Sequence, residues 1–98
     1  MNFEIAPKST EVQASWYDAR LYCFSLNIDG KTGWRLPSKE ELNRIYQSEN
    51  DLVGINYWSS TEKGDNHAWN QNFTGGYRNG YGNKDYGGNY VRAIRSLT

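Results

Sequence analysis

The chain has 98 residues, which is enough for one hydrophobic core and a single domain over residues 1–98. Its net charge of zero argues against a dedicated nucleic-acid binder, and no stretch approaches the roughly 20 apolar residues of a membrane span. A single cysteine, Cys23, and a single histidine, His67, exclude an internal disulfide and a metal site built from paired histidines.

The first part of the chain predicts a short strand and a helix. Phe3 and Ile5 favour the strand, and fold logic suggests that it pairs with the last strand. Four residues recur at spacings of three and four on one helical face: Trp16, Ala19, Cys23 and Leu26. This periodicity predicts a helix over residues 12–27. Two glycines and an Asp-Gly pair then predict a turn at residues 28–33.

A second helix is predicted to follow Pro37. Ser38 and Glu41 fit a capping box, in which each side chain accepts a hydrogen bond from the backbone N–H of the other residue. Three residues would form its buried stripe: Leu42, Ile45 and Tyr46. We expect this helix to end near Glu49.

The second half of the chain predicts strands. Residues 57–61 are rich in β-forming types, and residues 68–73 alternate as a strand does. One side of this second strand would carry Trp69, Gln71 and Phe73. Residues 63–66 predict a hairpin connection between the two, and residues 90–97 predict a last strand whose apolar residues do not alternate strictly.

Residues 75–90 are unusual in composition. Six of the sixteen are Gly, four are Tyr, three are Asn, and none is aliphatic. Such a segment cannot bury itself. Because a strand is predicted on either side, we expect an elaborated connection on the surface of a folded domain.

Three blocks of residues stand in an order that is typical of one bacterial family. They are Trp-Tyr-Asp-Ala-Arg at residues 16–20, Gly-Trp-Arg-Leu-Pro-Ser at residues 33–38, and Tyr-Trp-Ser-Ser-Thr-Glu at residues 57–62 with Val-Arg-Ala-Ile-Arg at residues 91–95. Jointly they resemble the domain family named for the C-terminal domain of the Legionella collagen-like adhesin. The resemblance covers about residues 16–95.

This resemblance implies an α+β domain with a C-type-lectin-like fold, related to that of the formylglycine-generating enzymes. In this fold two helices pack on small antiparallel sheets, and a long loop region carries the ligand surface. Family members are typically surface, adhesin or phage-associated proteins, and the adhesin itself binds sulfated polysaccharides as a trimer. The chain departs from the family in two ways. It lacks most of the strand region that usually precedes the first helix, and Ala93 stands where a second Cys often lies, which leaves Cys23 without a plausible partner.

Several conspicuous residues are expected to have structural roles. Trp34 and Trp58 should lie in the core, and Trp69 either lies there or serves as a stacking platform at a rim. Arg35 is expected to bind backbone carbonyls. Cys23, on the first helical stripe, is expected to be a small core residue.

We expect no catalysis, no metal and no cofactor. A nucleophilic hydroxyl among residues 59–61 would need a base, and no acid lies at a telling spacing from His67. The formylglycine-generating enzymes use paired cysteines, whereas this chain has one. Calcium remains possible because four loop carboxylates have Asn and Gly nearby: Asp29, Asp51, Asp65 and Asp85. Neither a twelve-residue calcium loop nor the Glu-Pro-Asn triplet of sugar-binding lectins is present.

Function is expected in the segment rich in Tyr, Asn and Gly. Tyr offers a large contact area at a small entropic cost, and Asn and Gly adapt their hydrogen bonds, as in antibody binding loops. The predicted ligand-binding residues are Asn66, Asn70, Asn72, Tyr77, Arg78, Asn79, Tyr81, Asn83, Lys84, Asp85, Tyr86, Asn89 and Tyr90. Arg78 and Lys84 are expected to favour sulfate or carboxylate groups. The alternative is a solvated loop without a ligand.

The sequence therefore favours a non-catalytic domain that recognises a glycan or protein on a cell surface. It predicts no nucleic acid and no membrane insertion. Weak single contacts would gain strength in a homo-oligomer, with a trimer favoured, or within a larger fibre. The expected location is extracellular, on a bacterial surface or a virion, although no signal peptide is visible at the start of the chain.

Two other interpretations stay open. The first is a structural or oligomerisation cap of a phage or surface fibre, and the second, less supported, is an enzyme of the formylglycine-generating type. The Asn- and Tyr-rich segment would also suit a variable region diversified by a retroelement that mutates adenines in Asn codons.

Overall fold

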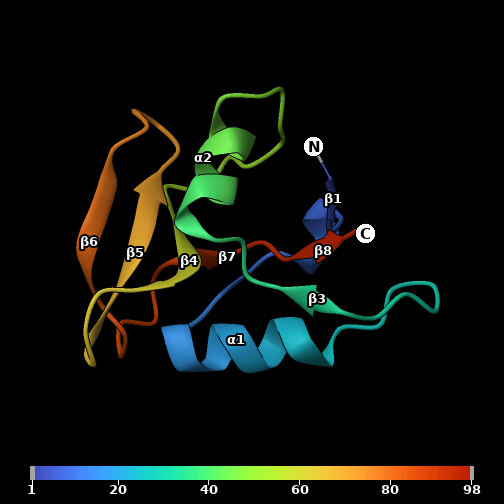
Figure 1. The fold of residues 1–98 in the computed structure, drawn as a ribbon, viewed down its shortest axis with the longest axis horizontal. Helices are drawn as coiled ribbons and strands as arrows, with labels where there is room; N and C mark the ends of the chain where they lie inside the picture. The colour runs from blue at the N-terminus through green and yellow to red at the C-terminus, as the bar shows by residue number, and fades with distance from the viewer. Residues whose placement is uncertain (1, 98) are drawn as a thin grey trace.

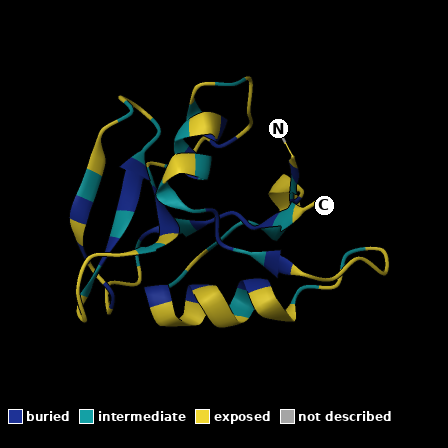
Figure 2. Ribbon diagram, viewed as in Figure 1, coloured by how far each residue is buried: buried dark blue, intermediate teal, exposed yellow. Residues whose placement is uncertain are grey.

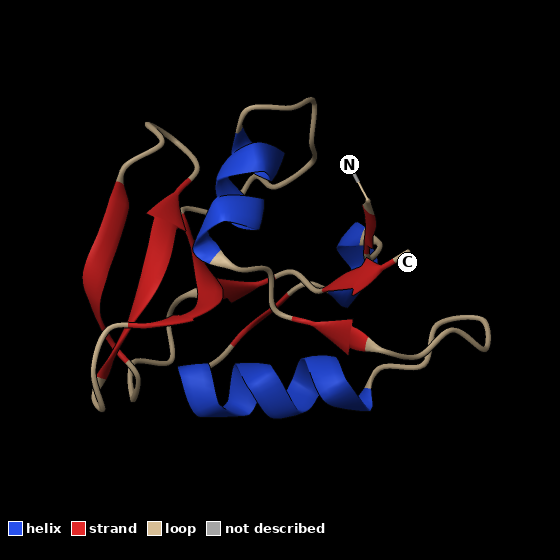
Figure 3. Cartoon of the chain, viewed as in Figure 1, coloured by secondary structure: helices blue, strands red, loops and turns tan. Residues whose placement is uncertain are grey.

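Two helices and two small sheets make up the α+β fold of residues 2–97, the residues described by the structure, which is a computed structural model (Figure 1). The elements in chain order are β1 (Phe3–Ile5), a 3-10 helix η1 (Lys8–Thr10), β2 (Val12–Gln13), α1 (Trp16–Ser25), β3 (Trp34–Arg35), α2 (Lys39–Tyr46), β4 (Asn56–Glu62), β5 (His67–Asn72), β6 (Arg78–Asn83), β7 (Tyr90–Val91) and β8 (Ile94–Ser96). Figure 3 shows that long irregular connections join these short elements.

The larger sheet has the strand order β2-β7-β4-β5-β6, and the smaller sheet has the order β1-β8-β3. Every pairing is antiparallel except that of β4 with β7, which is parallel. The prediction of antiparallel sheets is therefore wrong for the larger sheet, which is mixed. The predicted pairing of the N-terminal strand with the last one is confirmed, since Phe3 lies opposite Ser96.

Helix α2 covers one face of β4 and β5. Phe73 packs edge-on against Tyr46 of α2, with ring centroids 5.4 Å apart, and lies 4.9 Å from the ring of Tyr57. Gln71 Nε2 donates to Asn43 Oδ1 of α2 at 2.9 Å. Lys39 Nζ of α2 lies 4.4 Å from the ring centroid of Trp69. The predicted grouping of Trp69, Gln71 and Phe73 on one side of this segment is confirmed by these contacts.

Helix α1 packs against the opposite face of the same strands. Trp16, Ala19 and Cys23 share a core cluster with Trp58 of β4 and Ala68 of β5. In Figure 2 the inner side of α1 is buried and its outer side is exposed. The predicted helical stripe is therefore confirmed for its first three residues, while the fourth, near the end of the helix, is only partly buried.

The first helix is shorter than predicted at both ends. Val12 does not start a helix but pairs with Val91 in the larger sheet. The helix begins at Trp16 instead, after Ser15, whose Oγ accepts a hydrogen bond from the backbone N–H of Asp18 at 3.2 Å. A hydrophobic period alone could not place this boundary, because a partner 79 positions away in the chain decides it.

The capping box of the second helix is confirmed at Ser38 and Glu41. The helix ends at Tyr46, three residues earlier than expected. The hydroxyl of Ser48 and the side-chain amide of Asn50 both donate to the carbonyl of Ile45 at 2.8 Å. These local bonds replace the helical ones and end the helix.

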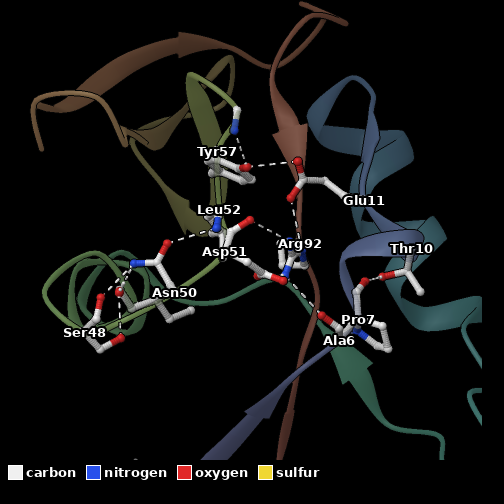
Figure 4. Close-up of polar contacts among 12 residues, drawn as sticks. Ala6, Pro7, Thr10, Glu11, Ser48, Asn50, Asp51, Leu52, Tyr57 and Arg92 are labelled. Atoms are coloured by element: carbon white, nitrogen blue, oxygen red, sulfur yellow. Dashed lines mark hydrogen bonds and ion pairs between the residues drawn. The ribbon is translucent and has the colours of Figure 1, made fainter.

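The predicted last strand is two strands in different sheets. Between β7 and β8 lies Arg92, whose buried guanidinium donates to Glu11 Oε2 at 3.1 Å and to Asp51 Oδ1 at 2.7 Å (Figure 4). It also donates to the carbonyls of Ala6 and Asp51 at 3.3 Å. Glu11 accepts a further hydrogen bond from the hydroxyl of Tyr57 at 2.9 Å. This ionic network joins the residue before β2, strand β4 and the irregular segment after α2 to the junction of the two sheets.

Residues 75–90 were expected to form a surface connection only. This expectation is corrected, because Arg78–Asn83 forms β6 at the edge of the larger sheet. Gly80 and Gly82 allow this strand to lie close to its neighbours. A Cβ atom at Gly80 would lie 2.9 Å from the ring of Trp69. The absence of these side chains makes room for the strand. Of the helices in residues 2–97, none is long and apolar enough to cross a membrane.

Candidate functional site

An open hollow of about 500 Å³ lies on the face of the larger sheet opposite α2. Its lining residues are Asn56, Asn70, Tyr77, Asn79, Gly82, Asn83, Asp85, Tyr86 and Asn89. We call it the amide hollow. Trp58 of β4, Asn70 of β5 and Asn79 of β6 lie side by side in register, so their side chains share one face. Helix α1 covers this face at Trp58, and the part with the asparagines is open.

Three carboxamides form the deeper part of the amide hollow. Asn70 is 7% exposed and Asn89 is 4% exposed, while Asn56 is half-buried. Within residues 2–97, these three side chains make no hydrogen bond. Their amide groups keep some exposed surface, and all three residues line the hollow, so the amides face it. Because buried polar groups normally find a partner, free amides at this depth point to a partner from outside the chain.

The rim of the amide hollow has fixed polar groups and exposed rings. Asn79 Oδ1 accepts from the backbone N–H of Tyr81, and Asn83 Oδ1 accepts from that of Asp85, both at 2.9 Å. These short-range bonds hold the two carboxamides in place and leave their NH₂ groups free to donate. Tyr86 is an exposed ring beside them.

Gly82 makes room for the deepest amide. A Cβ atom at this position would lie 2.5 Å from Asn70 Nδ2 and 2.9 Å from the ring of Trp58. Any larger residue would therefore push against both side chains. Sequence reasoning missed Gly82 and Asn56 as lining residues. The alternation of β4 was the available signal for Asn56, since it places this residue on the same face as Trp58.

Seven of the thirteen predicted ligand-binding residues line the amide hollow: Asn70, Tyr77, Asn79, Asn83, Asp85, Tyr86 and Asn89. Their role in binding stays a prediction. The other six lie elsewhere.

Lys84 is buried and cannot serve as the expected ligand cation. Its Nζ donates to Glu62 Oε2 at 2.7 Å and to the carbonyl of Asp65 at 2.9 Å, and it lies 4.3 Å from the ring centroid of Trp16. The hydrogen bond from Lys84 also lowers the pKa of the Glu62 carboxyl below its ordinary value. The expectation is corrected because the chain turns inward directly after β6: the backbone of Lys84 accepts from the N–H of Trp16 and donates to Asn66.

Tyr90 and Asn72 also have structural contacts. The ring of Tyr90 lies 5.6 Å from that of Tyr57, inside the fold. Asn72 Oδ1 accepts from the backbone N–H groups of Thr74 and Gly75 and so shapes the turn before β6. Neither lines the amide hollow.

Arg78, Tyr81 and Asn66 lie outside the amide hollow as well. Arg78 is opposite Gln71 in register, so its side chain starts on the face that α2 covers. The ring of Tyr81 has Lys63 Nζ 4.5 Å from its centroid. Asn66 is exposed in the connection between β4 and β5.

Comparison with protein families gives one match, the family described as the Lcl C-terminal domain, over residues 6–95. The chain belongs to the Lcl C-terminal domain family. No curated protein matches the chain. The resemblance stated from the three sequence blocks is thereby confirmed.

The blocks that carried the resemblance hold this Lcl C-terminal domain together. Trp16 Nε1 donates to the carbonyl of Ser59, and Trp58 Nε1 donates to that of Ala14, both at 2.9 Å. Trp34 and Trp58 are buried, as predicted. The expected role of Arg35 holds in part, since it donates to a backbone carbonyl at 3.3 Å.

The strongest contact of Arg35 is with a carboxylate. It binds both carboxylate oxygens of Glu41, at 2.8 and 2.9 Å. This pair lowers the pKa of Glu41 to about 2. The Trp-Arg-Leu-Pro-Ser block is thereby tied to the first turn of α2.

Three side chains of types that can carry chemistry have structural contacts in this Lcl C-terminal domain: Cys23, Ser59 and Asp51. Cys23 lies in the core cluster that also contains Ala93, and burial raises the pKa of its thiol to about 12. Ser59 Oγ donates to the carbonyl of Trp69 at 2.7 Å. Asp51 is bound by Arg92, which lowers its pKa. In residues 2–97, no group of three or more His, Cys, Asp or Glu side chains is placed to hold a metal ion.

A second hollow, of about 490 Å³, lies beside α1. Leu21 and Phe24 are exposed on its helical side, and Trp34 and Leu36 line its base. Together with the partly exposed Tyr17, these side chains give the Lcl C-terminal domain an apolar helix face that no described residue covers.

Proposed function

We propose that this Lcl C-terminal domain is a non-catalytic binding module that holds a cell-surface ligand in the amide hollow. The observation that carries the proposal is the pair Asn70 and Asn89. Their side chains are more than nine-tenths buried, yet their amides face the hollow without a partner in the chain. A site needs such polar groups to fix the orientation of its ligand.

Further support comes from the family and from the exposed rings. The family match suggests a domain associated with a collagen-like adhesin. Tyr77 and Tyr86 present large ring surfaces at the rim, suited to stacking on a sugar ring or filling a pocket of a protein. A C-type-lectin-like fold and a location on a bacterial surface or a virion are parts of the same proposal.

Diversification by a retroelement is a separate part of this proposal. Four Asn and Tyr residues on β6 and the connection after it line the amide hollow and belong to neither core cluster: Asn79, Asn83, Tyr86 and Asn89. Changes there would alter recognition and leave the fold intact. The nucleotide-level test is a near-identical template repeat beside the gene that differs only at adenines. An intact locus without such a repeat would refute this part.

The test compares two exposed tyrosines in a multivalent display of the domain on arrays of glycans and of cell surfaces. Tyr77 lines the amide hollow and is 71% exposed, whereas Tyr81 lies outside it and is 70% exposed. Replacing either by Ala removes the same ring from a site of the same exposure. We expect Tyr77→Ala to weaken binding and Tyr81→Ala to retain it, with the melting temperature unchanged in both.

Equal loss in both variants, or none in either, would show that the amide hollow is not the binding surface. A display of many copies is needed, because a small site gives a weak single contact that avidity multiplies by roughly 10²–10⁴.

The structural or oligomerisation cap remains as a second candidate, and the exposed face of α1 favours it. Phe24 and Leu21 are apolar and exposed, which is typical of a surface that another subunit covers. Phe24→Ser tests this candidate. It predicts a loss of the oligomer, measured by light scattering, and no change in ligand binding per subunit. A wild-type domain that is monomeric at micromolar concentration would refute it.

A further inference from the structure

We propose that the ligand of the amide hollow is an uncharged saccharide rich in hydroxyl groups, and that Asp85 selects against sulfated saccharides. This inference rests on the proposed function and names the ligand class of the same site.

Charge is the first argument. Among residues 2–97, Asp85 is the one charged side chain that lines the amide hollow. The two cations expected to attract sulfate are directed elsewhere: Lys84 is buried against Glu62, and Arg78 lies opposite Gln71 on the face of α2. A sulfate group in the hollow would therefore meet a carboxylate and no ammonium or guanidinium group to neutralise it.

Hydrogen-bonding capacity is the second argument. A sulfate ester offers only acceptors, and so does the carboxylate of Asp85. A sugar hydroxyl both donates and accepts. The free amides of Asn56, Asn70 and Asn89 each offer donors and an acceptor, so they match hydroxyl groups rather than an anion.

The arrangement of the rim is the third argument. Asn83 Oδ1 accepts from the backbone N–H of Asp85, which fixes the backbone that carries the carboxylate. The exposed rings of Tyr77 and Tyr86 line the same hollow. A saccharide has both surfaces that this site needs, since its C–H face stacks on a ring while its hydroxyls reach the amides and the carboxylate.

The experiment uses the multivalent domain and matched pairs of glycan polymers. Each pair carries the same sugar, glucose, galactose, mannose or N-acetylglucosamine, with or without a 6-O-sulfate. We expect at least one neutral polymer to bind. Its sulfated counterpart should bind with an affinity at least about fivefold lower, as repulsion between two nearby charges in water predicts. Asp85→Asn should weaken neutral binding and bring the sulfated polymer within about twofold of the neutral one.

A matched control separates the local charge of Asp85 from the net charge of the domain. Asp29 is exposed, lies in the connection between α1 and β3 at the other end of the molecule from β6 (Figure 1), and has a φ of 54° that Asn also adopts. Asp29→Asn changes the net charge equally and should leave both polymers unaffected. An equal effect of the two variants would overturn the role of Asp85.

The remaining outcomes distinguish this inference from the proposed function. Asn70→Ala should lower binding to the neutral polymer at least threefold, about the value of one net hydrogen bond. If sulfated polymers bind as well as neutral ones and Asn70→Ala abolishes both, the site stands and the ligand class is wrong. If cell surfaces bind through Tyr77 and no polymer binds, the ligand is none of these four sugars and the inference is overturned. If neither Asn70→Ala nor Tyr77→Ala affects any binding, the proposed function itself fails.

Discussion

Replacing Arg92 by Met should remove a large part of the stability of the domain. The guanidinium is buried and binds two carboxylates and two backbone carbonyls (Figure 4). The side chain of Glu11 is only 10% exposed, so Arg92→Met leaves a buried charge without its partner. Breaking such a pair costs about 3–5 kcal/mol. For a domain of this size, about 1 kcal/mol corresponds to about 5 °C, so the melting temperature should fall by about 15–25 °C.

The two carboxylates of this network differ in exposure, which gives the prediction an internal comparison. The side chain of Asp51 is 60% exposed, so its pair with Arg92 is worth about 1 kcal/mol or less, and Asp51→Asn should cost no more than that. In a Glu11→Gln background, where no buried charge is left behind, Arg92→Met should cost at least about 1.5 kcal/mol less than in the wild type.

The assay is urea unfolding followed by tryptophan fluorescence, with the midpoint and slope measured for each single and double variant. A cost of Arg92→Met below about 1 kcal/mol would refute the reasoning, and so would additive costs of Glu11→Gln and Arg92→Met. Either result would mean that the interior around Arg92 is hydrated in solution.

Three further predictions concern other parts of the fold. Arg35 lowers the folded-state pKa of Glu41 to about 2, below its ordinary value of 4.5, so the folded state binds this proton less readily than the unfolded state. The stabilisation is therefore present above pH about 4.5 and is lost as the pH falls towards 2. Glu41→Gln should flatten the dependence of the unfolding free energy on pH over this window, measured by urea unfolding. Cys23, which is buried and has a raised thiol pKa, should react with a thiol reagent at the rate of global unfolding, and fast labelling of the native protein would contradict its placement. Gly82→Ala should lower the melting temperature and abolish ligand binding, since its Cβ would lie 2.5 Å from Asn70 Nδ2; normal binding by this variant would show that the floor of the amide hollow rearranges.

Sequence reasoning worked where the decisive contacts are close in the chain. Ser38 and Glu41 are three residues apart, and their mutual capping follows from local geometry. The stripe from Trp16 to Cys23 was identified for the same reason. The start of α1 could not be predicted, because Val12 belongs to a strand only through its pairing with Val91.

The candidate site was predicted as a segment but not as a surface. The composition of residues 75–90 indicated where binding residues concentrate, yet the register of β6 decides which of them share a face. This register shifts between Ala68 and Asn70 of β5, and no local pattern predicts such an irregularity. The burial of Lys84 was equally hidden, since it depends on Glu62 and on the ring of Trp16.

The pairing of β1 with β8 has a mechanical consequence. Phe3 lies opposite Ser96 in two antiparallel strands, on the side of the molecule away from β6 (Figure 1). A force that pulls these two residues apart would open the strand pair one hydrogen bond at a time, starting at its outer end. A force between the amide hollow and either residue alone would act through the larger sheet, where many bonds share the load. The domain should therefore resist more force when it is held at one end and pulled through its ligand than when it is stretched between both ends.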